Sequence, residues 1–249
     1  MNETINKNRA PTSELQPEVS SRICCNCDEP LIGEYCYVCG QPSVVERYTP
    51  KNLFFEIYNN ARKIDISKTF ATSIELARRP GEFVHAYLAG QRVGYINPVK
   101  FYFYAMIANA LIREMLQIAT ADPIFASPLT GNTAFQIFGL LATVFWGVLW
   151  KLFYRGTELN WVEFAVCAIY FEAQTDIFTV TLLVFVAVFR EYTQFAYSAF
   201  VLADLLVTTA YGIYFARRVF RESWPMTIVK QSALLILFAA LLAFVVSDQ

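Results

Sequence analysis

"EFAVCAIYFEAQTDIFTVTLLVFVAVF", residues 163–189, is an apolar run in which only Glu163, Glu172 and Asp176 carry a formal charge. A helix needs about 20 mainly apolar residues to cross the hydrocarbon core of a bilayer, and this run is longer than that. Because Glu172 and Asp176 lie near its middle, the run is either one membrane span or an interfacial helix that leads into a shorter span. Both alternatives place this part of the chain at a membrane.

Four further apolar runs flank this one. They cover approximately residues 98–119, 133–153, 196–216 and 226–246. The first is the weakest because Arg113 and Glu114 interrupt it. The chain is 56% hydrophobic, whereas soluble domains contain about 45–50% apolar residues. We therefore expect an all-α integral membrane protein with about five transmembrane helices in a bundle of residues 98–249. The alternative, a soluble helical core, would have to cover more apolar surface than a small domain can.

Loop charges predict the orientation of these spans, since cytoplasmic loops carry an excess of Lys and Arg. The loop at 120–132 contains no cation, and Arg190 is the one exception on the predicted outer side. The cations on the predicted inner side are Lys151, Arg155, Arg217, Arg218, Arg221 and Lys230. We expect the N-terminus in the cytosol and the C-terminus outside a cell membrane, either inner or plasma membrane.

The N-terminal residues 1–21 are polar, contain two prolines and have no apolar stretch. Such a composition predicts a disordered tail and lacks the hydrophobic core of a secretory signal. The cysteines that follow are therefore expected in a reducing compartment, where metal binding is favoured over disulfides. The net charge of −1 gives no basic field that would attract nucleic acid, so no nucleic-acid partner is expected.

Residues 22–42 contain the spacing of a four-cysteine zinc ribbon, and Gly33 and Gly40 suit its tight turns. The expected ligands are Cys24, Cys27, Cys36 and Cys39. Four thiolates form a closed tetrahedral site typical of structural Zn²⁺, and in so short a segment the metal supplies most of the folding energy. An iron site of rubredoxin type and a dithiol redox pair are the alternatives. Cys25 is expected to be spare.

The other metal-binding residue types do not favour a catalytic site. A catalytic zinc needs an open coordination position, and His85, the only histidine, has no second histidine to pair with. We expect His85 to be a surface or packing residue. Cys167 is expected to be a small packing residue within a span.

Residues 48–97 predict short cytosolic or interfacial amphipathic helices, at 49–64, from Ser67 and from Pro80 to Gly90. Two interpretations remain open. The helices pack on one another, or they lie on the membrane surface with cationic and aromatic side chains near anionic headgroups. The residues of this membrane-interface segment are Arg78, Arg79, Arg92, Tyr95 and Lys100.

The stretch "RRPGEFVHAYLAGQRVGYINPVKFY", residues 78–102, follows the cysteine cluster. It contains a Pro-Gly, a Tyr-Leu-x-Gly-x-Arg and a Tyr-x-x-Pro that leads into the first apolar run. The matching residues are Pro80, Gly81, Tyr87, Leu88, Gly90, Arg92, Tyr95 and Pro98. In these features the chain resembles the bacterial membrane family of domain of unknown function 3667. The resemblance implies a short zinc ribbon followed by several spans, and it implies no catalytic residues.

Four ionisable side chains lie within the predicted spans, in the outer half of a core about 30 Å thick. They are Arg113, Glu172, Asp176 and Asp204. Glu172 and Asp176 are four residues apart and so share a helix face. Because ionisable groups in a membrane are costly, they pair or line wet cavities. The cluster is either a polar pocket that passes or senses a cation, or a structural ion pair such as Arg113 with Asp176.

The sequence favours a non-enzymatic integral membrane protein with a cytosolic docking head. We expect a scaffold or an assembly or trafficking factor, with the lipid bilayer and a protein bound through the zinc ribbon as partners, and possible homo-oligomers. No nucleophile–base set or phosphate-cradling glycine loop is present. A small transporter or channel that uses the intramembrane charges is the alternative. A membrane enzyme acting on lipid through Glu158 and Glu163 is a third hypothesis.

Overall fold

The computed structural model describes residues 22–51, 65–120, 133–189 and 196–247. The predicted tail at 1–21 and most of the predicted helix at 49–64 lie outside the described residues. The chain divides into two compact units, Met1–Val44 and Val45–Gln249. The described part of the first unit contains isolated β-bridges, Ile23 with Pro30 and Tyr35 with Pro42.

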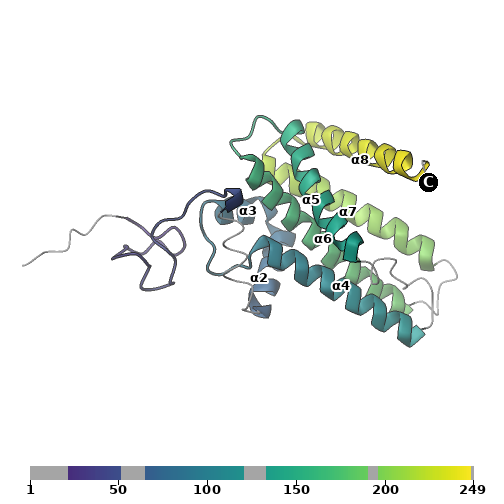
Figure 1. The fold of residues 1–249 in the computed structure, drawn as a ribbon, viewed down its shortest axis with the longest axis horizontal. Coiled ribbons are helices and arrows are strands. Elements are labelled where there is room, and N and C mark those ends of the chain that lie inside the picture. The colour runs from purple at the N-terminus through teal and green to yellow at the C-terminus, as the bar shows by residue number, and fades with distance from the viewer. Residues whose placement is uncertain (1–21, 52–64, 121–132, 190–195, 248–249) are drawn as a thin grey trace, which may run out of the picture. The chain divides into compact units, whose positions relative to one another are not determined.

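The described part of the second unit is entirely helical (Figure 1). Its helices are α2 (Ile66–Arg78), α3 (Pro80–Leu88), α4 (Pro98–Thr120), α5 (Thr133–Phe153), α6 (Trp161–Phe189), α7 (Ala196–Phe220) and α8 (Trp224–Ser247). Each of the five apolar runs forms one helix, α4 to α8, with ends within a few residues of those expected. The prediction that these segments are helical is therefore confirmed.

The beginnings of α6 and α4 follow from local side-chain capping. Asn160 precedes α6, and its Oδ1 accepts the Glu163 backbone N–H at 2.9 Å while Glu163 Oε2 accepts the Asn160 N–H at 2.8 Å, which is a reciprocal capping box. At α4, Asn97 Oδ1 accepts the Val99 N–H at 3.0 Å. The sequence predicts the second helix from Ser67, with this serine as its cap. The helix begins at Ile66 instead, so Ser67 lies inside its first turn and does not cap it.

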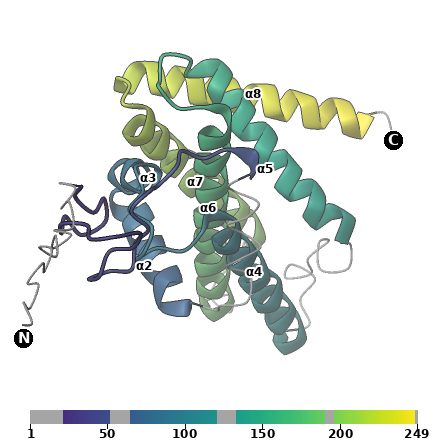
Figure 2. The ribbon, with the colours of Figure 1, turned by 60° about the vertical axis from the view of Figure 1, so that its left-hand side comes forward.

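Helix α6 is the hub of the second unit and contacts α2, α4, α5 and α7. Helices α3 and α8 pack on α7. In Figure 2, α4, α6 and α7 run side by side, whereas α8 crosses them at a steep angle. This arrangement brings the end of α7 next to α3, although these helices are far apart in the sequence.

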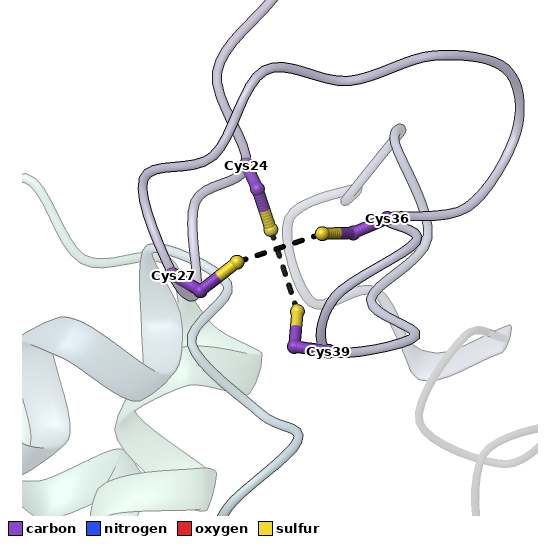
Figure 3. Close-up of side chains that lie close together, drawn as sticks. All are labelled: Cys24, Cys27, Cys36 and Cys39. Carbon is purple, nitrogen blue, oxygen red and sulfur yellow. Dashed lines mark hydrogen bonds between the residues drawn. The ribbon is translucent and has the colours of Figure 1, made fainter.

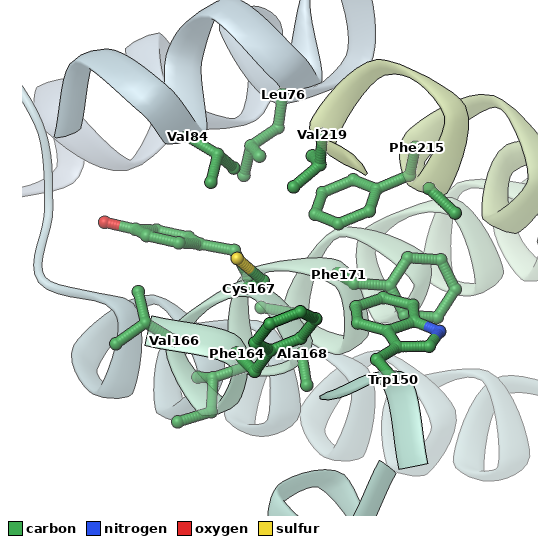
Figure 4. Close-up of a cluster of buried hydrophobic side chains, with 14 of the residues drawn as sticks. Leu76, Val84, Trp150, Phe164, Val166, Cys167, Ala168, Phe171, Phe215 and Val219 are labelled. Carbon is green, nitrogen blue, oxygen red and sulfur yellow. The ribbon is translucent and has the colours of Figure 1, made fainter. Parts of the chain in front are cut away.

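Aromatic side chains fill the core between these helices (Figure 4). Trp150 of α5 is fully buried, and its ring stacks on Phe215 with centroids 5.6 Å apart and meets Phe171 edge-on at 5.3 Å. Cys167 is fully buried in the same core, as expected of a packing residue.

The outer faces of α4 to α8 are apolar and exposed. Among their exposed side chains are Leu111, Met115, Val148, Val188, Leu206 and Val229. Within the described residues, two helices are long and apolar enough to cross a membrane, Trp161–Val188 and Ala199–Phe220. Only 33% and 22% of their most apolar stretches are buried, which is unlike the core helix of a soluble protein. The expected number of five spans stays a prediction.

Candidate functional site

The four predicted ligands converge in the first unit (Figure 3). The sulfur atoms of Cys24, Cys27, Cys36 and Cys39 all lie within 4.8 Å of one another. Cys24 Sγ is 3.6 Å from Cys39 Sγ, and Cys27 Sγ is 3.5 Å from Cys36 Sγ. Each close pair joins one Cys-x-x-Cys segment to the other, so the two segments enclose a single site.

The sulfur geometry fits a tetrahedral metal ion. A metal–sulfur bond of about 2.3 Å places neighbouring sulfurs of a tetrahedron about 3.8 Å apart, close to the spacing of the two short pairs. A disulfide would require about 2.05 Å, and all six cysteines are free. With four sulfur ligands, no coordination position remains open for a substrate.

The two cysteine segments have the same backbone hydrogen bonds. The Cys24 N–H donates to the Glu29 carbonyl at 2.9 Å, and twelve residues later the Cys36 N–H donates to the Gln41 carbonyl at 2.8 Å. The sequence signal for this internal repeat is Cys-x-x-Cys-x-x-Pro, which occurs at 24–30 and again at 36–42. Spacing of the cysteines alone did not reveal the repeat.

The turns of this unit depend on left-handed backbone conformations. Gly33 and Gly40 have φ values of 95° and 75°, which confirms their expected place in tight turns. Asp28 occupies the position equivalent to Gly40 with φ 61°, a conformation that Asp tolerates better than most residues. Cys25 corresponds to Tyr37 in the repeat and so lies outside the four-sulfur cluster.

Two of the four thiols are shifted in opposite directions. The Cys27 sulfur accepts from the backbone N–H of Glu29, but desolvation and the neighbouring sulfurs outweigh this hydrogen bond and raise its pKa to about 12, whereas the surroundings of Cys36 favour the ligating form. The backbone N–H of Cys39, with that of Val38, donates to the Cys36 sulfur and lowers the pKa of this thiol to about 7. The thiolate is the form that binds metal. Among residues 22–44, which the structure describes, Leu31 is the one residue besides the cysteines in the apolar core of this unit, and it is 4% exposed. So small a core implies that a bound metal supplies most of the folding energy.

Arg113 and Asp176, two residues of the predicted intramembrane cluster, are joined through Asn109, which the sequence pattern did not single out. Arg113 Nε donates to Asn109 Oδ1 at 2.7 Å, and Asn109 Nδ2 donates to Asp176 Oδ1 at 3.2 Å. Asn109 thus bridges the expected partners, which form no direct ion pair in the described structure. The sequence feature that could have identified Asn109 is its position four residues before Arg113, which puts both residues on one face of α4.

The other two acids of this cluster have separate surroundings. Asp204 on α7 accepts a hydrogen bond from Thr179 of α6, with 2.7 Å between Oγ1 and Oδ1. Glu172 lies one turn before Asp176, and its carboxylate does not take part in these hydrogen bonds in the described structure. The structure therefore brings Arg113 and Asp176 together and places Asp204 and Glu172 beside them on α7 and α6.

The residues of the predicted membrane-interface segment fall into different environments. The Arg92 guanidinium lies 4.1 Å above the Tyr48 ring and donates to the Glu46 carbonyl at 3.3 Å. Tyr95 is half-buried and packs edge-on against Phe83 at 4.9 Å. These two residues hold the segment together.

The remaining cations of the segment are nearer the surface. Arg79 pairs with Glu75 at 3.0 Å, Arg78 is exposed and Lys100 is half-buried. Among the five predicted interface residues, Arg78 is thus a cation that is exposed. The described structure shows no carboxylate partner for it.

The acids of the third hypothesis are arranged as structural groups. Glu163 is 2% exposed, and both of its carboxylate oxygens accept from Arg47, at 2.9 Å and 2.7 Å. The same Arg47 donates to the Glu158 carbonyl at 3.0 Å. The Glu163 carboxylate is therefore committed to Arg47 and to the cap of α6.

The comparisons with known proteins agree with the resemblance noted above. The model of one family, described as Protein of unknown function (DUF3667), matches residues 67–108. This segment contains nearly all of α2, the whole of α3 and the first half of α4, and it begins after the cysteines. No curated protein and no solved structure matches the chain.

Proposed function

We propose that this protein is a non-enzymatic, multi-pass membrane protein whose zinc-bound N-terminal head docks a cytosolic protein, so that it acts as a scaffold or as an assembly or trafficking factor. The observation that carries this proposal is the closed set of four sulfurs. A metal held by four cysteines has no free position for chemistry and instead makes a short segment rigid. A rigid segment presents a fixed surface to a partner.

The surface of the head supports binding to a protein. Its exposed apolar side chains include Ile23, Ile32, Tyr35, Tyr37 and Val38. Tyr37, for example, is 67% exposed. Aromatic and aliphatic groups of this kind are the anchors of protein interfaces.

The exposed apolar faces of α4 to α8 support five spans in a bilayer, since lipid covers such surfaces at no cost. The cations at the ends of α5 and α7 favour a cytosolic N-terminus and an outer C-terminus in the inner or plasma membrane. The family description reports no function. Homo-oligomers are compatible with the proposal, which depends only on the head and its tether.

A pull-down in mild detergent tests the docking role. We expect the wild type to contain about one zinc per chain and to retain partners that are lost when Cys36→Ser and Cys39→Ser are combined. Cys25→Ser is the matched control, because it removes a neighbouring thiol outside the cluster and should keep both metal and partners. Partners that persist after the metal is lost would refute the docking role, and iron in place of zinc would correct the metal.

A small transporter or channel is a second candidate, favoured by the hydrogen-bonded series Arg113, Asn109 and Asp176 between α4 and α6. This reading expects cation flux in proteoliposomes that Asp176→Asn and Asp204→Asn abolish. Asn at either position keeps the size of the side chain and removes its charge. If flux is absent in the wild type, the transport proposal fails while the docking proposal is unaffected.

A further inference from the structure

A cavity of about 330 Å³ opens where the end of α2, the beginning of α3 and the end of α7 meet. Its charged lining is dominated by arginine from two distant parts of the chain. These arginines are Arg78, Arg79, Arg217, Arg218 and Arg221. We call this cavity the arginine pocket. Its volume lies at the lower end of the range of small-molecule sites, about 300–1,000 Å³.

The two carboxylates at the pocket each have a cation partner. For Glu82 it is an arginine of the pocket itself, and for Glu222 it is a lysine outside the pocket, with the second Glu222 oxygen buried and without a hydrogen-bond partner in the described structure. Glu82 lies 3.5 Å from Arg79, which also pairs with Glu75 at 3.0 Å. Glu222 pairs with Lys230. Within the described residues, the other four arginines of the pocket have no carboxylate partner. The pocket therefore has an excess of positive charge that its own acids do not neutralise.

The walls of the pocket are held by specific contacts. The Tyr214 hydroxyl donates to the Arg78 carbonyl at 2.7 Å, and His85 Nε2 lies 2.9 Å from the Val219 carbonyl. Gly81 packs so closely on α7 that a Cβ there would overlap the Arg218 backbone carbonyl. These contacts fix α3 against α7, so the arginines project from a rigid frame.

Arg217 provides a hydrogen-bond donor without an acceptor. Its guanidinium lies 4.3 Å above the Trp224 ring, and its buried Nε has no hydrogen-bond partner in the described structure. Leaving a buried charged donor unsatisfied is costly. A bound anion would supply the missing acceptor.

Arg221 follows α7 with φ 56°, in the left-handed region. This is the position after a helix end where glycine is preferred, because a Cβ is unfavourable there. A strained residue of this kind indicates that its side chain has a use. In Arg221 the side chain contributes charge to the pocket.

The beginning of α3 adds further donors. No side chain caps this nine-residue helix, and Pro80 occupies its first turn. Gly81 and Glu82, which line the pocket, belong to the same first turn, where backbone N–H groups have no partner within the helix. Uncapped helix N-termini are common phosphate sites.

We infer that the arginine pocket binds a phosphate group, carried either by the headgroup of an anionic lipid or by a soluble phosphorylated compound. Arginine forks match phosphate oxygens in two-point hydrogen bonds, and both the free Nε of Arg217 and the uncapped α3 offer donors. This inference goes beyond the docking role and does not depend on the metal-bound head. It assigns a ligand to the helical unit itself.

The test uses the full chain in phosphatidylcholine nanodiscs. Phosphatidic acid as a minor lipid component probes the lipid source, and inorganic phosphate and pyrophosphate probe the soluble source. Native mass spectrometry measures retained lipid, and the fluorescence of Trp224 under Arg217 reports soluble anions, with Trp224→Phe to assign the signal. We expect saturable binding of one of these probes by the wild type.

Two variants and one control make the outcome decisive. Combined Arg217→Gln and Arg218→Gln should weaken binding by about tenfold or more, because charge-assisted hydrogen bonds are lost. Arg221→Gly should weaken binding without loss of folding, since glycine suits the backbone conformation at this position. This variant therefore still tests the pocket if the double variant fails to fold. Arg155→Gln removes an exposed cation outside the pocket and should bind like the wild type.

Retention of phosphatidic acid that depends on the pocket arginines would support the lipid source, and a response to soluble phosphate that depends on them would support the soluble source. Absence of binding to all three probes would overturn the inference. An equal loss in Arg155→Gln would also overturn it, because that result indicates only a general charge effect. Unchanged binding by folded Arg221→Gly would overturn it as well, because the anion would then not be held in the pocket that Arg221 lines.

Discussion

Gly81 shows how one missing methyl group allows two helices to meet. A Cβ at this position would overlap the carbonyl of Arg218, which is backbone and cannot move aside as a side chain can. Gly94 lies in the same region of the chain with nothing within 4 Å of its Cβ position. The two glycines therefore have different reasons to be small.

We predict that Gly81→Ala destabilises the protein by about 1–3 kcal/mol, the usual cost of overpacking. Gly94→Ala should leave stability unchanged or slightly higher, since alanine reduces the entropy of the unfolded chain. Thermal unfolding of the detergent-solubilised variants measures both. Equal midpoints for the two variants would contradict the close approach of α3 and α7.

His85 is a residue whose charge changes with pH just below neutrality. It is half-buried on α3, its Nε2 lies 2.9 Å from the Val219 carbonyl, and desolvation lowers its pKa below the ordinary 6.5. The folded state therefore favours the neutral ring. As the pH falls below 6.5, the unfolded chain binds a proton that the folded chain does not, so stability decreases.

We predict that unfolding midpoints of the wild type decrease between pH 7 and pH 5 relative to those of His85→Gln, which cannot titrate there. The difference between the two proteins isolates the histidine from the acids of the chain. Parallel pH profiles would show that His85 is equally solvated in both states and would contradict its packing against α7.

At the scale of the element, the beginning of α6 combines a cap with a long-range tether. Asn160 accepts the Glu163 N–H through Oδ1, and its Nδ2 donates to the Tyr48 carbonyl at 3.1 Å. The Glu163 carboxylate accepts the Asn160 N–H in turn, and it also binds Arg47, a residue 116 positions earlier in the chain. One asparagine thus holds both the helix start and the segment that leads from the head.

We predict that Asn160→Ala destabilises the protein by about 0.5–2 kcal/mol, the cost of a lost helix cap. Asn160→Asp keeps the oxygen that caps α6 but removes the donor to Tyr48, so it should recover most of this loss. Denaturant or thermal unfolding of the three proteins measures the difference. If Asn160→Asp is as unstable as Asn160→Ala, the bond to Tyr48 matters more than the cap.

The repeated cysteine element shows how little chain a metal site requires. Two segments with the same hydrogen bonds, and with a left-handed residue at the same position, contribute two sulfurs each. Within residues 22–44, Leu31 alone adds an apolar side chain to this core. Because each segment closes its own turn, both Cys-x-x-Cys pairs form locally. A metal bound to all four sulfurs would supply most of the free energy that orders the two segments and joins them.

For the whole molecule, the predicted topology can be tested by chemical labelling. Two variants each gain one cysteine and keep all native cysteines. The new cysteine replaces Ser127, in the predicted outer loop, in one variant and Gly156, in the predicted inner loop, in the other. A membrane-impermeant maleimide added to intact cells should label the first and not the second. The unsubstituted chain is the control, since its head is expected in the cytosol.

Labelling at Gly156 in intact cells, or protection at Ser127, would contradict five spans with a cytosolic N-terminus. The steep crossing of α8 over its neighbours makes its span the one to examine next (Figure 2). A cysteine after residue 246 that resists labelling in intact cells would indicate that α8 lies along the membrane surface.

By itself the sequence determined the local features of this protein. The bounds of α4 to α8 followed from apolar runs, because helix length and hydropathy are properties of contiguous residues. The ligands Cys24, Cys27, Cys36 and Cys39 followed from spacing, because each pair lies within one turn. The resemblance around Pro80 and Tyr87 likewise depended on a short continuous stretch and was confirmed by the family match.

Only the tertiary structure decided which helix faces meet. It placed Asn109 between Arg113 and Asp176, joined Arg47 to Glu163, and brought Arg78 beside Tyr214, 136 positions later, to form the arginine pocket. Such pairs depend on the rotation and packing of helices that are distant in the chain. An amphipathic pattern gives the buried face of a helix but not its partner. In α6, whose apolar residues are spread around the whole helix, the pattern does not give even the face.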